Sequence, residues 1–452
     1  MLTAKELTEK FPPYVSEILK KFEDAGFEIY IVGGVIRDLL TSREGFDWDF
    51  TTNATPEEIL KLFPNGFYDN KFGTVGIPDE SHHHPYEITT FRTEHGYSDK
   101  RRPDHVEWGK SLEEDLSRRD FTINALALNS KGEIIDPFEG KKDLEKKIVR
   151  AVRDPMERFD EDALRMMRAI RIAAELGFQI EDKTLEAIKK HAPTISLVAF
   201  ERIRDEFFKL LKSENADLGI LLLKESGILK EILPELDECF GVEQKSPKRH
   251  HKYDVGTHSV MALKHTPSKD LVTRFATLLH DIGKAKTQKI TDDGVITFYN
   301  HEVVGSRLAK DIADRFKLSK KDKEKIWVLV RRHQFTVDER QTDSAIRRFI
   351  KNVGKENMQD MLDLRVGDRL GGGATETSWR LEEFKKRLEE VQKQPFSVKD
   401  LKINGNDVMK ALGIPSGPKI GEVLNKLFAE VEKDQTKNTR EDLLKMVNEF
   451  KN

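Results

Sequence analysis

The sequence contains very little cysteine, since Cys239 is the single one among 452 residues. One thiol excludes an internal disulfide and a zinc-finger framework, and scarce cysteine is typical of reducing compartments. The sequence also has no apolar run of membrane-spanning length, and its start, MLTAKELTEKFPP, lacks the apolar core of an export signal. We therefore expect a cytoplasmic protein that has no membrane partner.

Neither sign of charge dominates, because the net charge is −3 although 35% of the residues are charged. This near balance excludes an indiscriminate nucleic-acid coat, and it leaves room for a basic face balanced by acidic surface elsewhere. A chain of this length is too long for one ordinary core, so we expect about two to four domains.

The periodicity of the sequence changes once along the chain. Short apolar runs typical of strands alternate with short helical segments up to residue 144, and nearly all later residues follow helical periodicity. The pattern predicts an α+β fold in which a mixed sheet with helices comes first and all-α regions follow. The four predicted domains are residues 1–144, 145–212, 213–375 and 376–452.

The first candidate site combines a glycine turn with two carboxylates. A buried strand is predicted before Gly33 and Gly34, a helix after them, and then a second strand that carries Asp47 and Asp49. Side chains two apart on a strand share one face, where two carboxylates repel unless a cation such as Mg²⁺ lies between them. The turn can bring backbone N–H groups to a phosphate. The alternative is a glycine turn followed by two solvated aspartates.

The segment 111–128, SLEEDLSRRDFTINALAL, is predicted to be helical and to carry a second set of polar residues. Arg118 and Arg119 are cations that could face phosphates, and Asn124 offers an amide for a ribose hydroxyl. A capped helix with a basic first turn is the alternative.

Residues 153–178 are predicted to form one helix with a stripe of alternating charges. Arg158, Asp162 and Arg165 fall on this stripe, with Glu161 beside it. An Asp and an Arg three residues apart can present an acceptor and a donor fork to the Watson–Crick edge of a base, and Arg168 extends the positive charge. A helix with ordinary ion pairs explains the same pattern.

Taken together, these segments resemble a known family. GGVIRD, DWDF, RRDFTINALAL, DPFEGKKDL, RFDEDALRMMRAIRIAAELGF and FERIRDEF occur in the order seen in class II tRNA nucleotidyltransferases. These bacterial enzymes build the CCA end of tRNA, and the bacterial poly(A) polymerases are their relatives. The resemblance implies a polymerase-β-like head followed by a helical neck, body and tail, with tRNA, CTP and ATP as partners and pyrophosphate as a product.

The resemblance also implies roles for individual residues. Asp47 and Asp49 would be the catalytic pair that holds Mg²⁺, and Glu87 is the best candidate for a third carboxylate. Asp162 and Arg165 would read the base of CTP or ATP in place of a nucleic-acid template. The nucleotide-binding residues implied in this way are Gly33, Gly34, Arg37, Arg118, Asp120, Asn124, Arg158, Glu161, Asp162, Arg165 and Arg168.

Residues 92–110 are polar and charged without a period, so they are predicted to form a flexible loop. This loop resembles the one that such enzymes use when they change from C to A addition, and its full length favours complete CCA synthesis. Addition of CC alone or of the terminal A alone is the alternative.

A separate set of histidines and aspartates recurs in the helical half. Imidazole and carboxylate ligands suit a transition metal or Mg²⁺, and this many ligands could hold one ion or two. The set resembles the HD superfamily of metal-dependent phosphohydrolases, and Lys284 in HDIGK also fits it. The implied ligands of a divalent metal (Mg, Mn, Ni or Co) are His258, His280, Asp281 and Asp368, with His301 and His333 as in two-metal members.

Three hypotheses compete with CCA synthesis by an enzyme that also has phosphodiesterase or phosphatase activity. A poly(A) polymerase would add many A residues and ignore CTP. A partial enzyme would add only CC or only A. A hydrolase with a degenerate, RNA-binding head is the third, and the intact pair Asp47 and Asp49 counts against it. Either a monomer or a homodimer agrees with the sequence.

Overall fold

The computed structural model describes residues 2–43, 47–70, 73–78, 85–95, 105–108, 111–244, 252–338, 340–392 and 398–450. The chain divides into two compact units. The first comprises residues 1–243, 254–264 and 311–318, and the second comprises residues 244–253, 265–310 and 319–452. Among the described helices, none combines the length and apolar composition that crossing a bilayer requires. The four predicted domain boundaries stay predictions.

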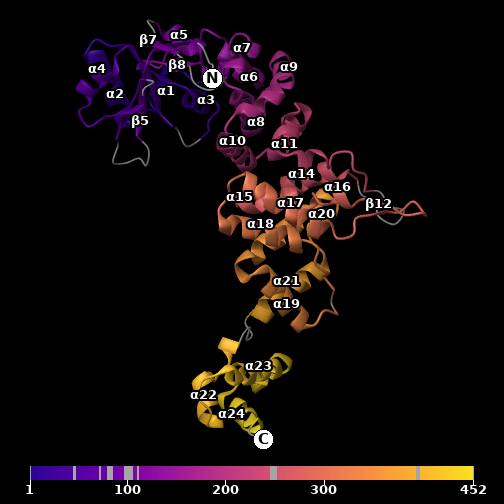
Figure 1. Ribbon diagram of the computed structural model, residues 1–452. Helices are drawn as coiled ribbons and strands as arrows, with labels where there is room; N and C mark the ends of the chain where they lie inside the picture. Colours follow the sequence, from indigo (N-terminus) through magenta and orange to yellow (C-terminus); the bar gives the residue numbers. More distant parts are fainter. Residues whose placement is uncertain are drawn as a thin grey trace. The chain divides into compact units, whose positions relative to one another are not determined.

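The first unit begins with a mixed sheet, as predicted, in the indigo part of the chain (Figure 1). Its seven described strands lie in the order β3-β4-β5-β2-β1-β8-β9. Among these described pairs, β2 and β5 are parallel and the others antiparallel. The strands are β1 (Ile29–Val32), β2 (Asp49–Thr52), β3 (Phe67–Asn70), β4 (Thr74–Ile77), β5 (Tyr86–Thr90), β8 (Ala127–Leu128) and β9 (Ile134–Ile135). The accompanying helices are α1 (Ala4–Thr8), α2 (Pro13–Asp24), α3 (Gly34–Leu40), α4 (Pro56–Leu62), α5 (Leu112–Ser117) and α6 (Gly140–Lys146).

The register of the sheet places the predicted carboxylates together. Asp49 pairs with Val32 on one side and with Glu87 on the other. The prediction of a strand that includes Asp47 is wrong, because β2 begins at Asp49. The chain turns away at Gly33, directly after Val32, so no residue of β1 remains to pair with the positions before Asp49.

The predicted helix over residues 111–128 is also wrong. Helix α5 ends at Ser117, a 3₁₀ turn covers residues 122–124, and Ala127 and Leu128 enter the sheet. The helix stops because the buried Asp120 carboxylate accepts hydrogen bonds from the Phe121 N–H and the Asn124 amide. These bonds hold the backbone in a turn that offers an alternative to helical pairing.

The predicted single helix over residues 153–178 is two helices, α7 (Pro155–Glu161) and α8 (Leu164–Leu176). Asp162 is extended, with φ −144° and ψ 104°, and its side chain accepts a hydrogen bond from the Leu164 N–H at 3.0 Å. An aspartate that caps the next helix from an extended conformation ends the first one. Asp162 therefore does not belong to a continuous helical stripe.

The predicted loop over residues 92–110 contains two strands, β6 (Arg92–His95) and β7 (His105–Trp108), which pair antiparallel. Their charged residues obscure the strand signal in the sequence. Residues 96–104 and 109–110 lie outside the described part of the chain, and with them most of the predicted loop.

The rest of the first unit is mainly helical. Phe316 is fully buried against Phe200 and Phe207, with ring centroids 5.0 and 5.4 Å away, so residues 311–318 belong to this core. The helices are α9 (Asp182–His191), α10 (Phe200–Lys212), α11 (Ala216–Glu225), α12 (Ile228–Ile232), α13 (Pro234–Asp237) and α14 (Val255–His265), and a parallel pair is formed by β10 (Ile148–Val149) and β11 (Gln179–Ile180).

In its described residues, the second unit is helical apart from the short hairpin of β12 (Lys289–Ile290) and β13 (Ile296–Thr297). Its helices up to residue 392 are α15 (Leu271–Leu279), α16 (Lys284–Thr287), α17 (His301–Arg315), α18 (Lys320–Arg332), α19 (Asp343–Val353), α20 (Met358–Gly371) and α21 (Trp379–Gln392).

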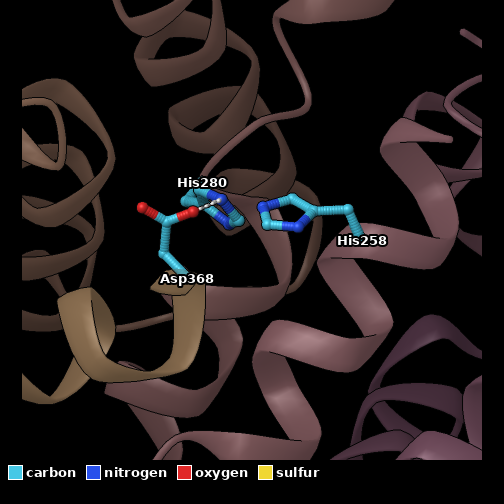
Figure 2. A group of neighbouring side chains, drawn as sticks. All are labelled: His258, His280 and Asp368. Carbon is cyan, nitrogen blue, oxygen red and sulfur yellow. Dashed lines mark ion pairs between the residues drawn. The ribbon is translucent and has the colours of Figure 1, made fainter. Parts of the chain in front are cut away.

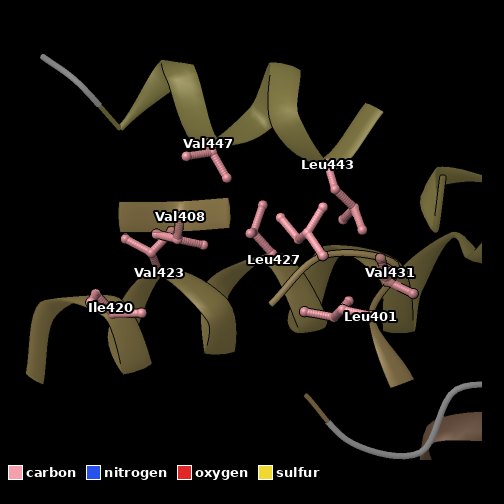
Figure 3. Close-up of a cluster of buried hydrophobic side chains, with 9 residues drawn as sticks. Leu401, Val408, Ile420, Val423, Leu427, Val431, Leu443 and Val447 are labelled. Atoms are coloured by element: carbon pink, nitrogen blue, oxygen red, sulfur yellow. The ribbon is translucent and has the colours of Figure 1, made fainter. Parts of the chain in front are cut away.

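The C-terminal helices α22 (Gly405–Leu412), α23 (Pro418–Lys433) and α24 (Arg440–Glu449) enclose a small core of their own (Figure 3). Asn404 caps α22 with a reciprocal hydrogen-bond pair to Asp407, and Thr439 caps α24. The buried residues of this core are Leu401, Ile403, Val408, Ile420, Val423, Leu427, Val431, Leu443 and Val447.

Candidate active site and metal centre

A cavity of about 340 Å³ in the first unit collects most of the residues predicted to bind a nucleotide. The glycine turn after β1, the start of β2, the turn after α5 and the start of α8 contribute its walls. The predicted residues that are not part of its lining are Arg37, Asp47, Glu87, Arg158 and Glu161. The lining residues are Gly33, Gly34, Asp49, Arg118, Arg119, Asp120, Asn124, Asp162, Leu164, Arg165, Arg168 and Arg202.

The glycine turn brings the backbone close to a carboxylate and a cation. Gly33 has φ +85°, a conformation that glycine adopts readily and other residues rarely. A Cβ atom on Gly33 would lie 3.6 Å from both an Asp49 oxygen and an Arg119 nitrogen. The turn therefore forms one wall of the cavity directly beside Asp49.

Asp49 is buried and lies close to other carboxylates. The pKa of its carboxyl is raised to about 7, mainly by burial and then by the negative charges of Asp47 and Glu87. The positive charge of Arg119 opposes this rise. A divalent cation would relieve this repulsion, and carboxylate oxygens are suitable ligands for Mg²⁺. The residues present therefore fit the predicted cation.

Two arginines of the cavity are held by one buried carboxylate. Asp115 accepts from Arg118 at 2.7 Å and from Arg119 at 3.2 Å, and its side chain is fully buried. Burial would raise the pKa of Asp115, but both guanidinium groups outweigh it and lower the pKa. The Arg119 Nε atom has no hydrogen-bond partner among the described residues. Asp115 thus fixes the position of two cations that face the cavity.

Asp120 and Asn124 connect three segments of the site. Arg168 on α8 donates to Asp120 at 2.6 and 2.8 Å. Arg37 on α3 donates to the side-chain Oδ1 atom of Asn124 at 2.8 Å. Burial would raise the pKa of Asp120, but Arg168 and Asn124 hold it well below its usual range. Protein donors thus already occupy both oxygens of Asp120. This arrangement does not support the predicted contact of Asp120 with a sugar or phosphate.

The predicted base-reading pair lies at the α7–α8 break. Asp162 pairs with Arg202 at 2.8 Å, while Arg165 donates to Glu161 at 2.7 Å and to the Arg118 carbonyl oxygen at 3.2 Å. Arg158 also pairs with Glu161. Ion pairs within the protein therefore hold both side chains in place, Asp162 against Arg202 and Arg165 against Glu161.

The nucleotide-binding residues implied by the resemblance did not include Asp115 or Arg202. They also did not include Arg119, although the sequence itself offers it as a cation for phosphates. Arg202 lies 40 positions after its partner Asp162, and only the fold brings them together. A signal for it existed, because FERIRDEF, which contains Arg202, is one of the segments that carry the family resemblance.

A second cluster lies in the second unit and is centred on the buried Asp281. One oxygen of Asp281 lies 3.3 Å from His301 Nε2 and 3.6 Å from His333 Nε2. The other lies 3.3 Å from His280 Nε2, which in turn lies 3.6 Å from Asp368 (Figure 2). Asp281, His301 and His333 can hold one ion between them. Five of the six predicted ligands are thus adjacent within this unit.

His258, also drawn in Figure 2, is buried on α14 and is assigned to the first unit, so its role as a sixth ligand stays a prediction.

The imidazoles of the cluster are oriented by backbone carbonyl groups. The Nδ1 atoms of His280, His301 and His333 lie 2.7–2.8 Å from the carbonyl oxygens of Thr277, Phe298 and Val330. A carbonyl oxygen can only accept, so each Nδ1 carries hydrogen and each Nε2 lone pair points inward when the ring is neutral. This outer hydrogen bond is usual for histidines that bind metal.

The Nε2 atoms and carboxylate oxygens at the centre of the cluster are acceptors that a cation would satisfy. His301 Nε2 and His333 Nε2 are two acceptors 3.3 Å apart. Burial would raise the pKa of Asp281, but Lys284 and His280 hold it well below its usual value. Burial would lower the pKa of His280, but Asp281 and Asp368 raise it. A proton or a metal ion between these groups satisfies them, so the donor set fits a divalent metal.

Gly283 explains how α17 reaches the cluster. A Cβ atom there would lie 2.1 Å from the His301 carbonyl oxygen and 2.6 Å from the Gly305 nitrogen. The absence of a side chain allows the turn after His280-Asp281 to contact α17. This close approach places His301 beside Asp281.

Three segments of the chain match families of RNA-modifying enzymes. Residues 29–150 match the family described as "Poly A polymerase head domain". Residues 177–240 match the family described as "Probable RNA and SrmB- binding site of polymerase A", and residues 301–447 match "tRNA nucleotidyltransferase domain 2 putative".

Several individual relatives are similar to the chain. It is 35% identical to the CCA-adding enzyme of Ligilactobacillus salivarius over 429 residues, which cover 94% of both chains. It is 51% identical to the CCA-adding enzyme of Limosilactobacillus reuteri over 218 residues, or 48% of this chain and 53% of that one. The chain thus spans about half the length of this curated relative, and the same holds for those of Lactobacillus helveticus and Leuconostoc mesenteroides.

Solved structures share the fold. The Bacillus stearothermophilus CCA-adding enzyme in complex with CTP is 28% identical, with a TM-score of 0.72, and the match covers 97% of this chain and 98% of that one. The Thermotoga maritima CCA-adding enzyme complexed with tRNA is 21% identical, with a TM-score of 0.61 over 99% of this chain and 98% of that one, and shows the fold alone.

Proposed function

The chain belongs to the family of CCA-adding enzymes, and from this membership we propose that it adds C, C and A to the 3′ end of tRNA. CTP and ATP would be the substrates and pyrophosphate the released product. The observation that supports this function best is the single cavity that holds the glycine turn, Asp49 and the pair Asp162 and Arg165. It combines groups for a triphosphate, a cation and a base edge.

The carboxylates and the arginines of the site would have different roles in nucleotidyl transfer. Asp47 and Asp49, with Glu87 nearby, would hold Mg²⁺, which makes the tRNA 3′-hydroxyl more acidic and neutralises the α-phosphate. Arg118 and Arg119, fixed by Asp115, face the charge of the triphosphate.

Selection of the base falls to the protein. Asp162 would accept from an exocyclic amino group, which both cytosine and adenine carry, and the Arg165 guanidinium would donate to a ring nitrogen or carbonyl oxygen. Arg202 and Glu161 hold these two side chains in place. Selectivity for tRNA would come from its shape and backbone, because folded duplex RNA offers little base sequence to side chains.

The decisive experiment supplies tRNA that ends before CCA with CTP, with ATP and with both, and measures the product lengths. We expect two added residues with CTP and three with both nucleotides. Growth beyond three would indicate a poly(A) polymerase, arrest after CC in the presence of both would indicate a partial enzyme, and absence of C incorporation would contradict the proposal.

A second function is supported by the shared ligand Asp281 and the three oriented histidines. We propose that the second unit is a metal-dependent phosphohydrolase of the HD type, acting as a phosphodiesterase or phosphatase with Mg, Mn, Ni or Co. Two ligand groups that share one carboxylate suit a pair of ions, which together stabilise both oxygens of a displacement at phosphorus.

The two activities should be separable. Asp47→Ala with Asp49→Ala should abolish nucleotide addition and leave hydrolysis of bis(p-nitrophenyl) phosphate unchanged, while His280→Ala with Asp281→Ala should do the reverse. Loss of both activities from either folded double variant would contradict two independent sites.

A further inference from the structure

We infer that the substrate of the second unit's metal site is a single strand of RNA, which extends from the metal ligands into two adjoining cavities lined by arginine and aromatic side chains. The inference rests on the proposed hydrolase function and names its substrate class. It depends on three cavities of the second unit: the metal cavity at Asp281 and His333, the arginine cavity at Arg332 and Arg348, and the tryptophan cavity at Trp379.

The metal cavity has a volume of about 670 Å³ and provides cations beside the metal ligands. Lys284 lies 2.6 Å from Asp281, and Arg365 lies one helical turn before Asp368, 3.4 Å from its carboxylate. The Arg365 Nε atom has no hydrogen-bond partner among the described residues. These two cations suit the phosphate at which hydrolysis occurs.

The arginine cavity, about 290 Å³, adjoins the metal cavity through Gln334, which lines both. Arg331 pairs with Glu302 at 3.2 Å, whereas the Arg332 Nε atom is buried without a partner among the described residues. Arg348 adds a third guanidinium to the lining. The arginines therefore exceed the acidic charge around this cavity, which suits an anion.

The tryptophan cavity, about 350 Å³, shares Arg365 with the metal cavity and Phe335 with the arginine cavity. Trp379 is 64% exposed, which is unusual for the largest apolar side chain. The Arg380 guanidinium lies 5.1 Å from the centre of its ring. An exposed indole beside arginines offers a stacking surface for a base.

The three adjoining cavities together offer the kinds of group that a polynucleotide needs. Successive phosphates of one strand need successive cations, and unpaired bases need aromatic faces. A mononucleotide would occupy only the metal cavity and would leave the arginines of the other two without a ligand. In the reaction, water is added across one P–O bond, so that hydroxide joins phosphorus and the proton joins the released sugar oxygen.

Binding tests the inference without any metal. A fluorescent tetraribonucleotide is titrated with the full chain in EDTA, as unmodified protein and as Arg332→Ala with Arg348→Ala, Trp379→Ala and the control Arg307→Ala. Arg307 is exposed on α17 and lines none of the three cavities. We expect affinity at least fivefold weaker for the first two variants and unchanged for the control. The double variant should also reduce the slope of log affinity against log salt by about 1.4, or 0.7 per arginine.

Measuring the hydrolysis of two substrates then tests the RNA substrate separately from the proposed hydrolase function. With Mn²⁺ present, the double variant and Trp379→Ala should raise the KM for cleavage of the tetraribonucleotide and leave hydrolysis of bis(p-nitrophenyl) phosphate unchanged. Equal effects on both substrates, or unchanged RNA affinity in both variants, would overturn the inference. If the unmodified protein cleaved neither substrate, the proposed hydrolase function would be wrong instead.

Discussion

Buried charged side chains fix the positions of their neighbours in both the nucleotide cavity and the cluster at Asp281, and Asp120 is the clearest example. Its carboxylate accepts from the Phe121 N–H, Asn124 and Arg168, and it joins the 3₁₀ turn to α8. Since protein donors occupy both oxygens, Asp120 acts by positioning its partners. Arg168 and Asn124 also line the cavity, so a change at Asp120 should affect nucleotide binding through them.

The Asp120–Arg168 pair predicts acid sensitivity. Because the pKa of Asp120 is depressed in the folded state, the unfolded chain binds the extra proton as the pH falls below about 4, and stability is lost in that range. Arg168→Ala leaves a buried carboxylate without its main partner and should lower the free energy of unfolding by about 2–4 kcal/mol at pH 7. Urea unfolding at pH 7 and pH 3 measures both effects. A variant as stable as the unmodified protein at pH 7 would contradict this prediction.

Gly283 allows a second test at the scale of one residue. Gly283→Ala places a methyl group 2.1 Å from the His301 carbonyl oxygen, so α17 must shift and with it His301, the proposed ligand. We expect a loss of about 1–3 kcal/mol of stability and weaker Mn²⁺ binding in calorimetry. Gly421→Ala, on α23 with no atom within 4 Å of the new Cβ, is the matched control. It should leave Mn²⁺ affinity unchanged.

At the scale of elements, the α7–α8 break gives Asp162 two separate roles. Its carboxylate caps α8 through the Leu164 N–H and pairs with Arg202 in the cavity wall. Asp162→Ala should lower stability by about 1 kcal/mol through the lost cap. Asp162→Asn keeps a capping oxygen but adds a donor, so it should retain most stability and lose discrimination between nucleotides. Thermal unfolding and competition of CTP and ATP against GTP and UTP compare the two. Unchanged selectivity in Asp162→Asn would contradict base reading by this residue.

The same break shows where sequence reasoning succeeds and fails. The buried strand before Gly33, the carboxylate at Asp49 and the ligands around Asp281 follow from local pattern and residue chemistry, and the structure confirms their proximity. The breaks at Asp120 and Asp162 do not follow from helical periodicity, because each carboxylate bonds to a backbone N–H group of its own segment and so competes with the helix. The ion pairs with Arg168 and Arg202 do not follow either, because these partners are 48 and 40 positions away and only the fold brings them close.

At the scale of the whole molecule, the two proposed metal sites belong to two compact units. They should respond differently to divalent ions, because the cluster at Asp281 is buried and its histidines are already oriented. Mn²⁺ at 100 times its Kd should stabilise the second unit by about 2.7 kcal/mol. His301→Ala with His333→Ala should remove this gain in thermal unfolding, and Asp47→Ala with Asp49→Ala should keep it. An equal loss in both double variants would contradict separate metal sites.

The small core around Leu427 has a consequence for synthesis on the ribosome. Leu443 and Val447 lie on α24, and they pack against residues that begin at Leu401. Proteins fold as their chains emerge, N-terminal parts first, so this core can close only after α24 has left the ribosome. A premature stop codon that removed α24 would leave seven of the nine core residues without their cover, as an apolar surface that protein quality control can recognise.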